Sequence, residues 1–108
     1  MQKLGHSWVD VFKIDVEGAE YGAFEALAAA EHDAMRFTQL QVEVHFGKSD
    51  GFQAVSNANL RQFELLRSLM ASGFRAMSVE PNIYTAGQTC FEFAFVRMDE
   101  CGNVVTPR

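Results

Sequence analysis

The pattern of hydrophobic and polar positions predicts four strands. Residues 8–16 are largely apolar at both odd and even positions, which is typical of a strand buried on both faces. Residues 37–46 alternate between apolar and polar side chains, as a strand with one buried face does. Two shorter strands are expected at residues 74–80, which Pro81 ends, and at residues 90–96.

Two segments between these strands have the periodicity of helices. Residues 19–31 place apolar side chains three and four positions apart, and their alanines favour a helix. Residues 60–72 form the second helix, with an asparagine at 57 or 59 as its N-cap and Gly73 at its C-terminal turn. The buried face expected for this helix consists of Leu60, Phe63, Leu66 (or Leu65), Leu69 and Met70.

The order strand, helix, strand, helix, strand, strand predicts an α/β fold. Helical crossovers make the first three strands parallel, whereas residues 81–89 are too few for a helical crossover. The fourth strand is therefore expected to run antiparallel to the others.

The carboxyl ends of the three parallel strands are expected to share one edge of the sheet, where ligands bind in α/β proteins. The antiparallel strand starts at that edge. The polar residues expected there are Asp15, Glu17, Glu43, His45, Glu80, Asn82 and Glu92. Carboxylates gathered in this way bind a divalent cation, receive an amine or act as a general base. The alternative is that they are polar strand ends that face water.

Composition narrows the classes of function. The 108 residues suffice for one small domain, and 48% of them are hydrophobic, enough for a core. The net charge of −5 and the scattered basic residues argue against nucleic acid as a partner. No signal peptide or membrane span is recognisable, so no membrane partner is expected and the cytoplasm is slightly favoured, with the compartment left open. Cys90 and Cys101 lack metal-site or disulfide spacing and are interpreted as ordinary thiols, so no metal is assigned.

Residues 10–20, Asp-Val-Phe-Lys-Ile-Asp-Val-Glu-Gly-Ala-Glu, resemble a segment of class I S-adenosylmethionine-dependent methyltransferases of the FkbM-like branch, D-x-x-K-I-D-V-E-G-x-E. Segments within residues 39–45, 73–82 and 90–95 resemble the same branch. The resemblance implies the C-terminal half of a Rossmann-like sheet, whose strand order is 3-2-1-4-5-7-6 with strand 7 antiparallel. Residues 1–108 would then be a partial methyltransferase domain containing strands 4 to 7.

The resemblance also implies a cofactor and roles for residues. Such enzymes hold S-adenosylmethionine through a glycine-rich loop after strand 1, a pattern that this sequence lacks. We therefore expect the N-terminal cofactor-binding half to be absent. Asp15 would lie nearest the cofactor and the acceptor, with Glu17 beside it and His45 as a second catalytic group, a general base. The residues expected to bind the acceptor, a small molecule or glycan with an oxygen or nitrogen nucleophile, are Glu43, Glu80, Asn82 and Glu92.

Two alternatives stay open at the level of sequence. The chain could be a non-catalytic remnant or subunit that keeps the fold. It could also be a small α/β module that binds a divalent cation through Asp15, Glu17, Glu43 and His45. With the N-terminal half absent, the apolar strand over residues 8–16 would lie at an edge of the sheet, so we expect self-association through it. A stable monomer in gel filtration at high concentration would contradict that expectation.

Overall fold

The computed structural model describes residues 2–16, 19–29, 35–45, 58–81 and 90–107. Its elements are η1 (Gln2–Leu4), β1 (Val9–Ile14), α1 (Glu20–Ala29), β2 (Phe37–His45), α2 (Ala58–Ala71), β3 (Phe74–Pro81) and β4 (Cys90–Arg97). All four predicted strands and both predicted helices are therefore present, together with a short 3-10 helix that the sequence pattern did not predict. The last residues of the predicted first helix, 30–31, lie outside the described residues.

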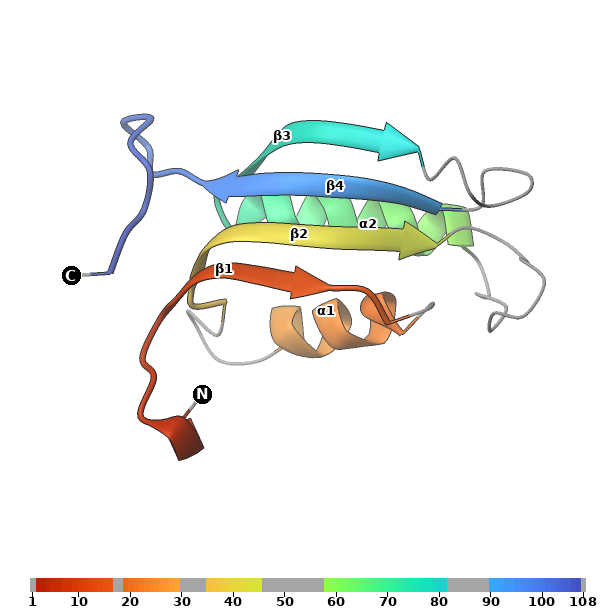
Figure 1. Ribbon diagram of the computed structural model, residues 1–108. Coiled ribbons are helices and arrows are strands. Elements are labelled where there is room, and N and C mark those ends of the chain that lie inside the picture. The colour runs from red at the N-terminus through yellow and green to blue at the C-terminus, as the bar shows by residue number, and fades with distance from the viewer. Residues whose placement is uncertain (1, 17–18, 30–34, 46–57, 82–89, 108) are drawn as a thin grey trace.

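The four strands form one mixed sheet in the order β1-β2-β4-β3. β1 and β2 pair in parallel, whereas β4 pairs antiparallel with both β2 and β3. β3 must therefore run in the same direction as β1 and β2, and the arrows of these three strands point away from both chain termini (Figure 1). The antiparallel direction predicted for the fourth strand is confirmed.

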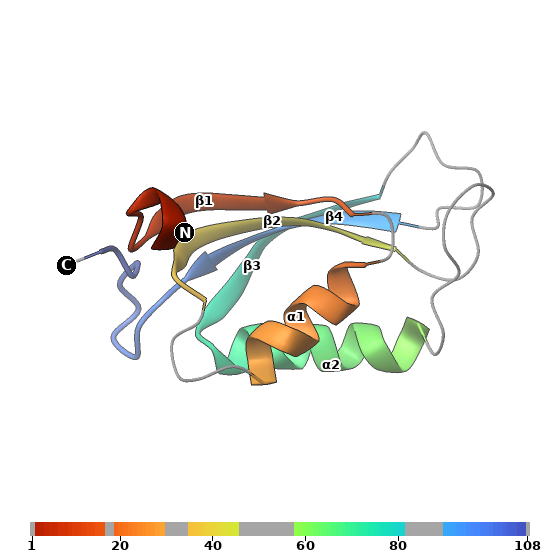
Figure 2. The same ribbon diagram turned by 90° about the horizontal axis from the view of Figure 1, so that it is seen from below.

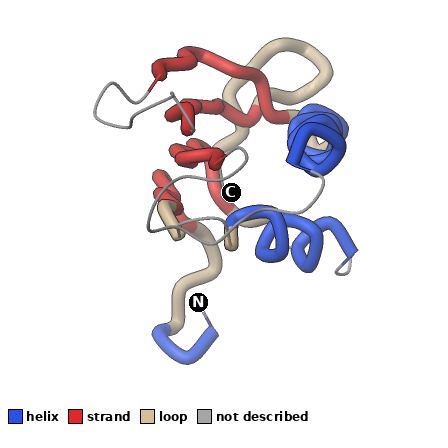
Figure 3. The backbone as a smooth tube through the Cα atoms, turned by 90° about the vertical axis from the view of Figure 1, so that its right-hand side faces the viewer, coloured by secondary structure: helices blue, strands red, loops and turns tan. Residues whose placement is uncertain are grey.

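Both helices pack on one face of the sheet, which gives the molecule two layers (Figures 2 and 3). No helix of the described part of the chain covers the other face. The expectation that residues 8–16 are buried on both faces is therefore wrong for this chain, because Val11 is 47% exposed and Val16 is 42% exposed. β1 lies at an edge of the described sheet, as the self-association hypothesis requires, and self-association itself stays a prediction.

The core lies between the sheet and the two helices. Its largest fully buried apolar side chains are Tyr21, Phe24, Phe74, Phe95, Leu40 and Leu69. The ring of Phe37 lies between those of Phe12 and Phe74, with centroid distances of 5.2 and 5.3 Å. Aromatic pairs at this separation stabilise the packed state beyond the area that they bury.

The predicted buried face of α2 is correct only in part. Leu69 is buried, Leu66 is partly buried, and Leu65, the alternative to Leu66, is buried as well. The other three predicted positions are exposed: Leu60 by 63%, Phe63 by 62% and Met70 by 56%. Residues spaced by three and seven positions share a stripe on a helix. Positions 60, 63 and 70 therefore form an outward stripe, opposite the stripe of positions 65 and 69.

Candidate functional site

The predicted acidic edge forms at the carboxyl ends of β1, β2 and β3. Asp15 follows β1, His45 ends β2, and the start of β4 lies at the same edge. Glu43 of β2 pairs with Glu92 of β4, which in turn pairs with Glu80 of β3. Three carboxylates thus occupy one row across three neighbouring strands. Glu17 and Asn82, which were also expected at this edge, lie outside the described residues.

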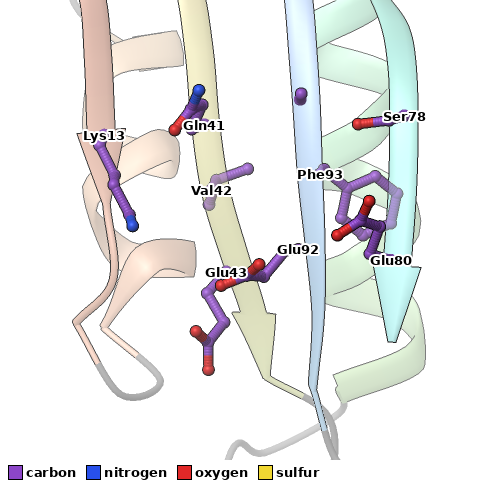
Figure 4. A pocket seen from close by; sticks show the side chains of 9 residues that line it. Lys13, Gln41, Val42, Glu43, Ser78, Glu80, Glu92 and Phe93 are labelled. Carbon is purple, nitrogen blue, oxygen red and sulfur yellow. The ribbon is translucent and has the colours of Figure 1, made fainter. Parts of the chain in front are cut away.

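A cavity of about 190 Å³ lies along this row of carboxylates. Its polar lining consists of Lys13, Gln41, Glu43, Ser78, Glu80 and Glu92. Figure 4 shows Glu92 extending from β4 towards β2, with Lys13 on β1 at the opposite side of the cavity. The cavity is smaller than the roughly 300–1,000 Å³ typical of small-molecule sites. It therefore suits a small ligand or one end of a larger one.

The first turn of α1 binds the backbone at the end of β2. Glu20 is fully buried, and its Oε1 atom accepts a hydrogen bond from the backbone N–H of His45 at 2.8 Å. The Tyr21 hydroxyl donates to the His45 carbonyl oxygen at 2.7 Å. Burial and the adjacent Glu20 raise the pKa of Tyr21, so its hydroxyl keeps the proton that it donates. The pairing of β1 with β2 ends at Ile14. Glu20 and Tyr21 therefore bind the part of β2 that lies beyond this pairing.

His45 lies between two carboxylates. Its Nδ1 atom is 3.0 Å from Glu20 Oε1, and its Nε2 atom is 3.2 Å from Glu43 Oε1. The residue is only 4% exposed, which differs from the open position expected of a general base that reaches its substrate. Glu20 was not among the residues that the sequence analysis placed at this site. Its place as the last acid of the D-x-x-K-I-D-V-E-G-x-E segment was the available signal for a more specific role.

Asp15 belongs to the same group of side chains. Partial desolvation of the carboxyl, together with the negative charge and hydrogen bond of Glu43, raises the pKa of Asp15 above its ordinary value, and the nearby His45 partly offsets this. Of the sequence-predicted residues, the structure therefore brings together Asp15, Glu43 and His45 at one point, with Glu92 and Glu80 further along the cavity.

The raised pKa of Asp15 predicts how stability depends on pH. The native state holds the proton of the Asp15 carboxyl more tightly than the unfolded state does. The stability gained by binding this proton is therefore lost as pH rises from the ordinary value of 3.8 through the raised pKa. We expect Asp15→Asn to raise the melting temperature slightly at neutral pH, with the gain shrinking towards acid pH. Thermal melts followed by circular dichroism, one at neutral pH and one at acid pH, would measure the change in melting temperature. Asp10→Asn, which removes an exposed carboxylate from β1, is the control. Equal gains for Asp15→Asn at both pH values would contradict the prediction.

Cys90 is the residue that sequence reasoning missed at this site. It is fully buried and lies directly opposite His45 in the β2–β4 register. Ligand atoms of Cys90, His45 and Glu43 lie within 4.8 Å of one another. Spacing along the chain could not reveal this group, because two antiparallel strands bring its members together. Cys101 is exposed, as an ordinary thiol can be.

Comparison with known families decides where the chain belongs. A family model described as the methyltransferase FkbM domain matches residues 1–105. The chain belongs to this family. The resemblance found in the sequence motifs is thereby confirmed, and the chain is a methyltransferase by family. Neither the curated proteins nor the solved structures contain a match to it. None of the helices in the described residues is long and apolar enough to cross a membrane.

Family membership implies that a methyl donor binds. The described residues fit one part of such a donor. S-adenosylmethionine has a positively charged sulfonium and an ammonium group at its methionine end. Carboxylates at the edge of the sheet, including Asp15, Glu43 and Glu92, complement those charges. The cavity volume of about 190 Å³ is below the roughly 300–1,000 Å³ typical of sites that hold a whole small molecule, so the fit concerns the methionine end alone.

Proposed function

We propose that the chain takes part in S-adenosylmethionine-dependent methyl transfer at the carboxyl ends of β1 and β2. The observation that supports this most is the meeting of Asp15, Glu43 and His45 beside a cavity, in a chain of the FkbM methyltransferase domain family. The strand order β1-β2-β4-β3 with β4 antiparallel also agrees with strands 4, 5, 7 and 6 of a Rossmann-like sheet. On this proposal the described sheet is part of such a fold.

The cofactor supplies an electrophilic methyl group, and the protein must place an acceptor atom in line with it. Asp15 is the catalytic residue in this proposal. A carboxyl with a raised pKa is a stronger base than an ordinary aspartate and takes the proton that the acceptor hydroxyl or amine loses. His45 is buried, so we assign the direct proton transfer from the acceptor to Asp15 alone.

The cavity lining suggests the class of acceptor. Glu43, Glu80 and Glu92 accept hydrogen bonds from hydroxyl or amine groups, and Lys13 and Gln41 donate to oxygen atoms. Alternating donors and acceptors of this kind suit a polyhydroxylated small molecule or the end of a glycan. Glu17 and Asn82 stay predicted members of the cofactor and acceptor sites.

Calorimetric titration of the chain with S-adenosylhomocysteine tests the proposal. We expect binding in the micromolar range and a loss of roughly tenfold or more in Asp15→Asn, since a hydrogen bond to a charged group contributes about 1.5–3 kcal/mol. Glu100→Gln, which changes an exposed acid near the C-terminus, is the matched control and should bind like the wild type. Absence of binding by a folded chain would contradict the proposal and favour the non-catalytic alternative, which the lack of a glycine-rich motif also favours.

A further inference from the structure

The group formed by Glu43, His45 and Cys90 combines three different ligand atoms at one buried point. His45 and Cys90 face each other on antiparallel strands, and Glu43 precedes His45 by two positions on the same face of β2. Cys90 is fully buried, and the side chains of His45 and Glu43 are 5% and 11% exposed. A carboxylate oxygen, an imidazole nitrogen and a thiol sulfur thus lie within 4.8 Å of one another.

Glu20 orients the imidazole ring of His45 for ligation. Its Oε1 atom lies 3.0 Å from Nδ1. A carboxylate at that position accepts the proton of an Nδ1–H, and a metal ion would then bind the other ring nitrogen, Nε2. The Nε2 atom is the one that approaches Glu43, at 3.2 Å. A carboxylate that accepts the second ring proton of a ligating histidine is the usual outer-shell arrangement of protein metal sites.

The donor set selects the class of ion. Thiolate and imidazole ligands favour Zn²⁺ and related d-block ions, whereas Mg²⁺ and Ca²⁺ prefer six or more oxygen atoms. Zinc–ligand bonds of about 2.0–2.3 Å in a tetrahedron hold neighbouring ligand atoms roughly 3.3–3.8 Å apart. The Nε2–Oε1 distance of 3.2 Å is already near that range. The distances from the Cys90 sulfur to the other two ligand atoms are at most 4.8 Å, so a modest contraction would bring them into the range as well.

We propose that Glu43, His45 and Cys90 form a binding site for a divalent d-block cation, with Zn²⁺ the preferred ion. Three protein ligands leave one coordination position open, as catalytic zinc sites do. Glu43 also lines the cavity, so the site adjoins the space assigned to the acceptor. This proposal differs from the cation module inferred from sequence, which had no sulfur ligand. It also stands without methyl transfer, because metal binding is measured with neither donor nor acceptor present.

Titration with Co²⁺, a spectroscopic substitute for Zn²⁺, tests the site. The chain is kept reduced with a phosphine in metal-free buffer, and we expect saturation at one equivalent with a thiolate-to-cobalt absorption band in the near ultraviolet. One equivalent of Zn²⁺ should abolish the band. Cys101→Ser should behave like the wild type, because Cys101 is exposed and lies outside the group. Cys90→Ser should lose the band.

Two further measurements protect the test against a variant that fails to fold. Glu20→Gln should weaken Co²⁺ binding by about 10–100-fold while keeping the thiolate band, as expected of an outer-shell residue. X-ray absorption of the wild-type chain loaded with Zn²⁺ should show one sulfur neighbour. A folded wild-type chain without a thiolate band would overturn the proposal.

Discussion

Glu20→Ala is expected to destabilise the protein by about 3 kcal/mol, because it leaves a backbone N–H and a ring nitrogen of His45 without their buried acceptor. The free energy of unfolding of small domains is only about 5–15 kcal/mol, so the substitution removes a large share of it. Urea unfolding followed by circular dichroism measures the change. Glu20→Gln keeps an oxygen that can accept from the His45 N–H, so its loss should be smaller.

Glu25→Ala is the matched control for this experiment. Glu25 lies on the same helix, where it forms an exposed ion pair with Arg61 at 2.9 Å between Nε and Oε1. Exposed ion pairs contribute little, because water and salt screen them. A loss of stability in Glu25→Ala as large as that in Glu20→Ala would show that the burial of Glu20 has no special importance.

Gly73→Ala is expected to cost roughly 1–3 kcal/mol of stability, as positions held at unfavourable backbone angles do. Gly73 joins α2 to β3 with a φ of +92°, and an added Cβ would lie 2.9 Å from the carbonyl oxygen of Met98. The backbone there has little freedom to move, because the Gly73 carbonyl accepts the Met98 N–H at 2.9 Å. The urea midpoint should therefore fall, with an unchanged slope.

Gly102→Ala separates the two causes of this loss. Gly102 also has a positive φ, +80°, but nothing lies within 4 Å of the Cβ that would be added there. The Gly102→Ala variant should lose only the stability that comes from glycine's tolerance of a positive φ, about 1 kcal/mol. If Gly73→Ala and Gly102→Ala lose equal stability, crowding against Met98 contributes nothing.

The sequence alone determined the four strands and two α-helices of this protein and the acidic character of one sheet edge. Alternation over residues 37–46 and the three-and-four spacing over residues 19–31 are local signals, because each depends on neighbours within a few positions. Strand direction followed from the lengths of the connections, and it placed Asp15, Glu43 and His45 at one edge. The motif over residues 10–20 then indicated the family, which the family model confirms.

Only the tertiary structure decided which side chains meet. The outward position of Phe63 on α2 depends on how the helix is rotated against the sheet, and the apolar periodicity of α2 allowed more than one rotation. The burial of Glu20 against His45 joins residues 25 positions apart, and the pairing of His45 with Cys90 depends on strand register. These contacts are non-local, so chain spacing could not reveal them, although they form the structural basis of the proposed metal site.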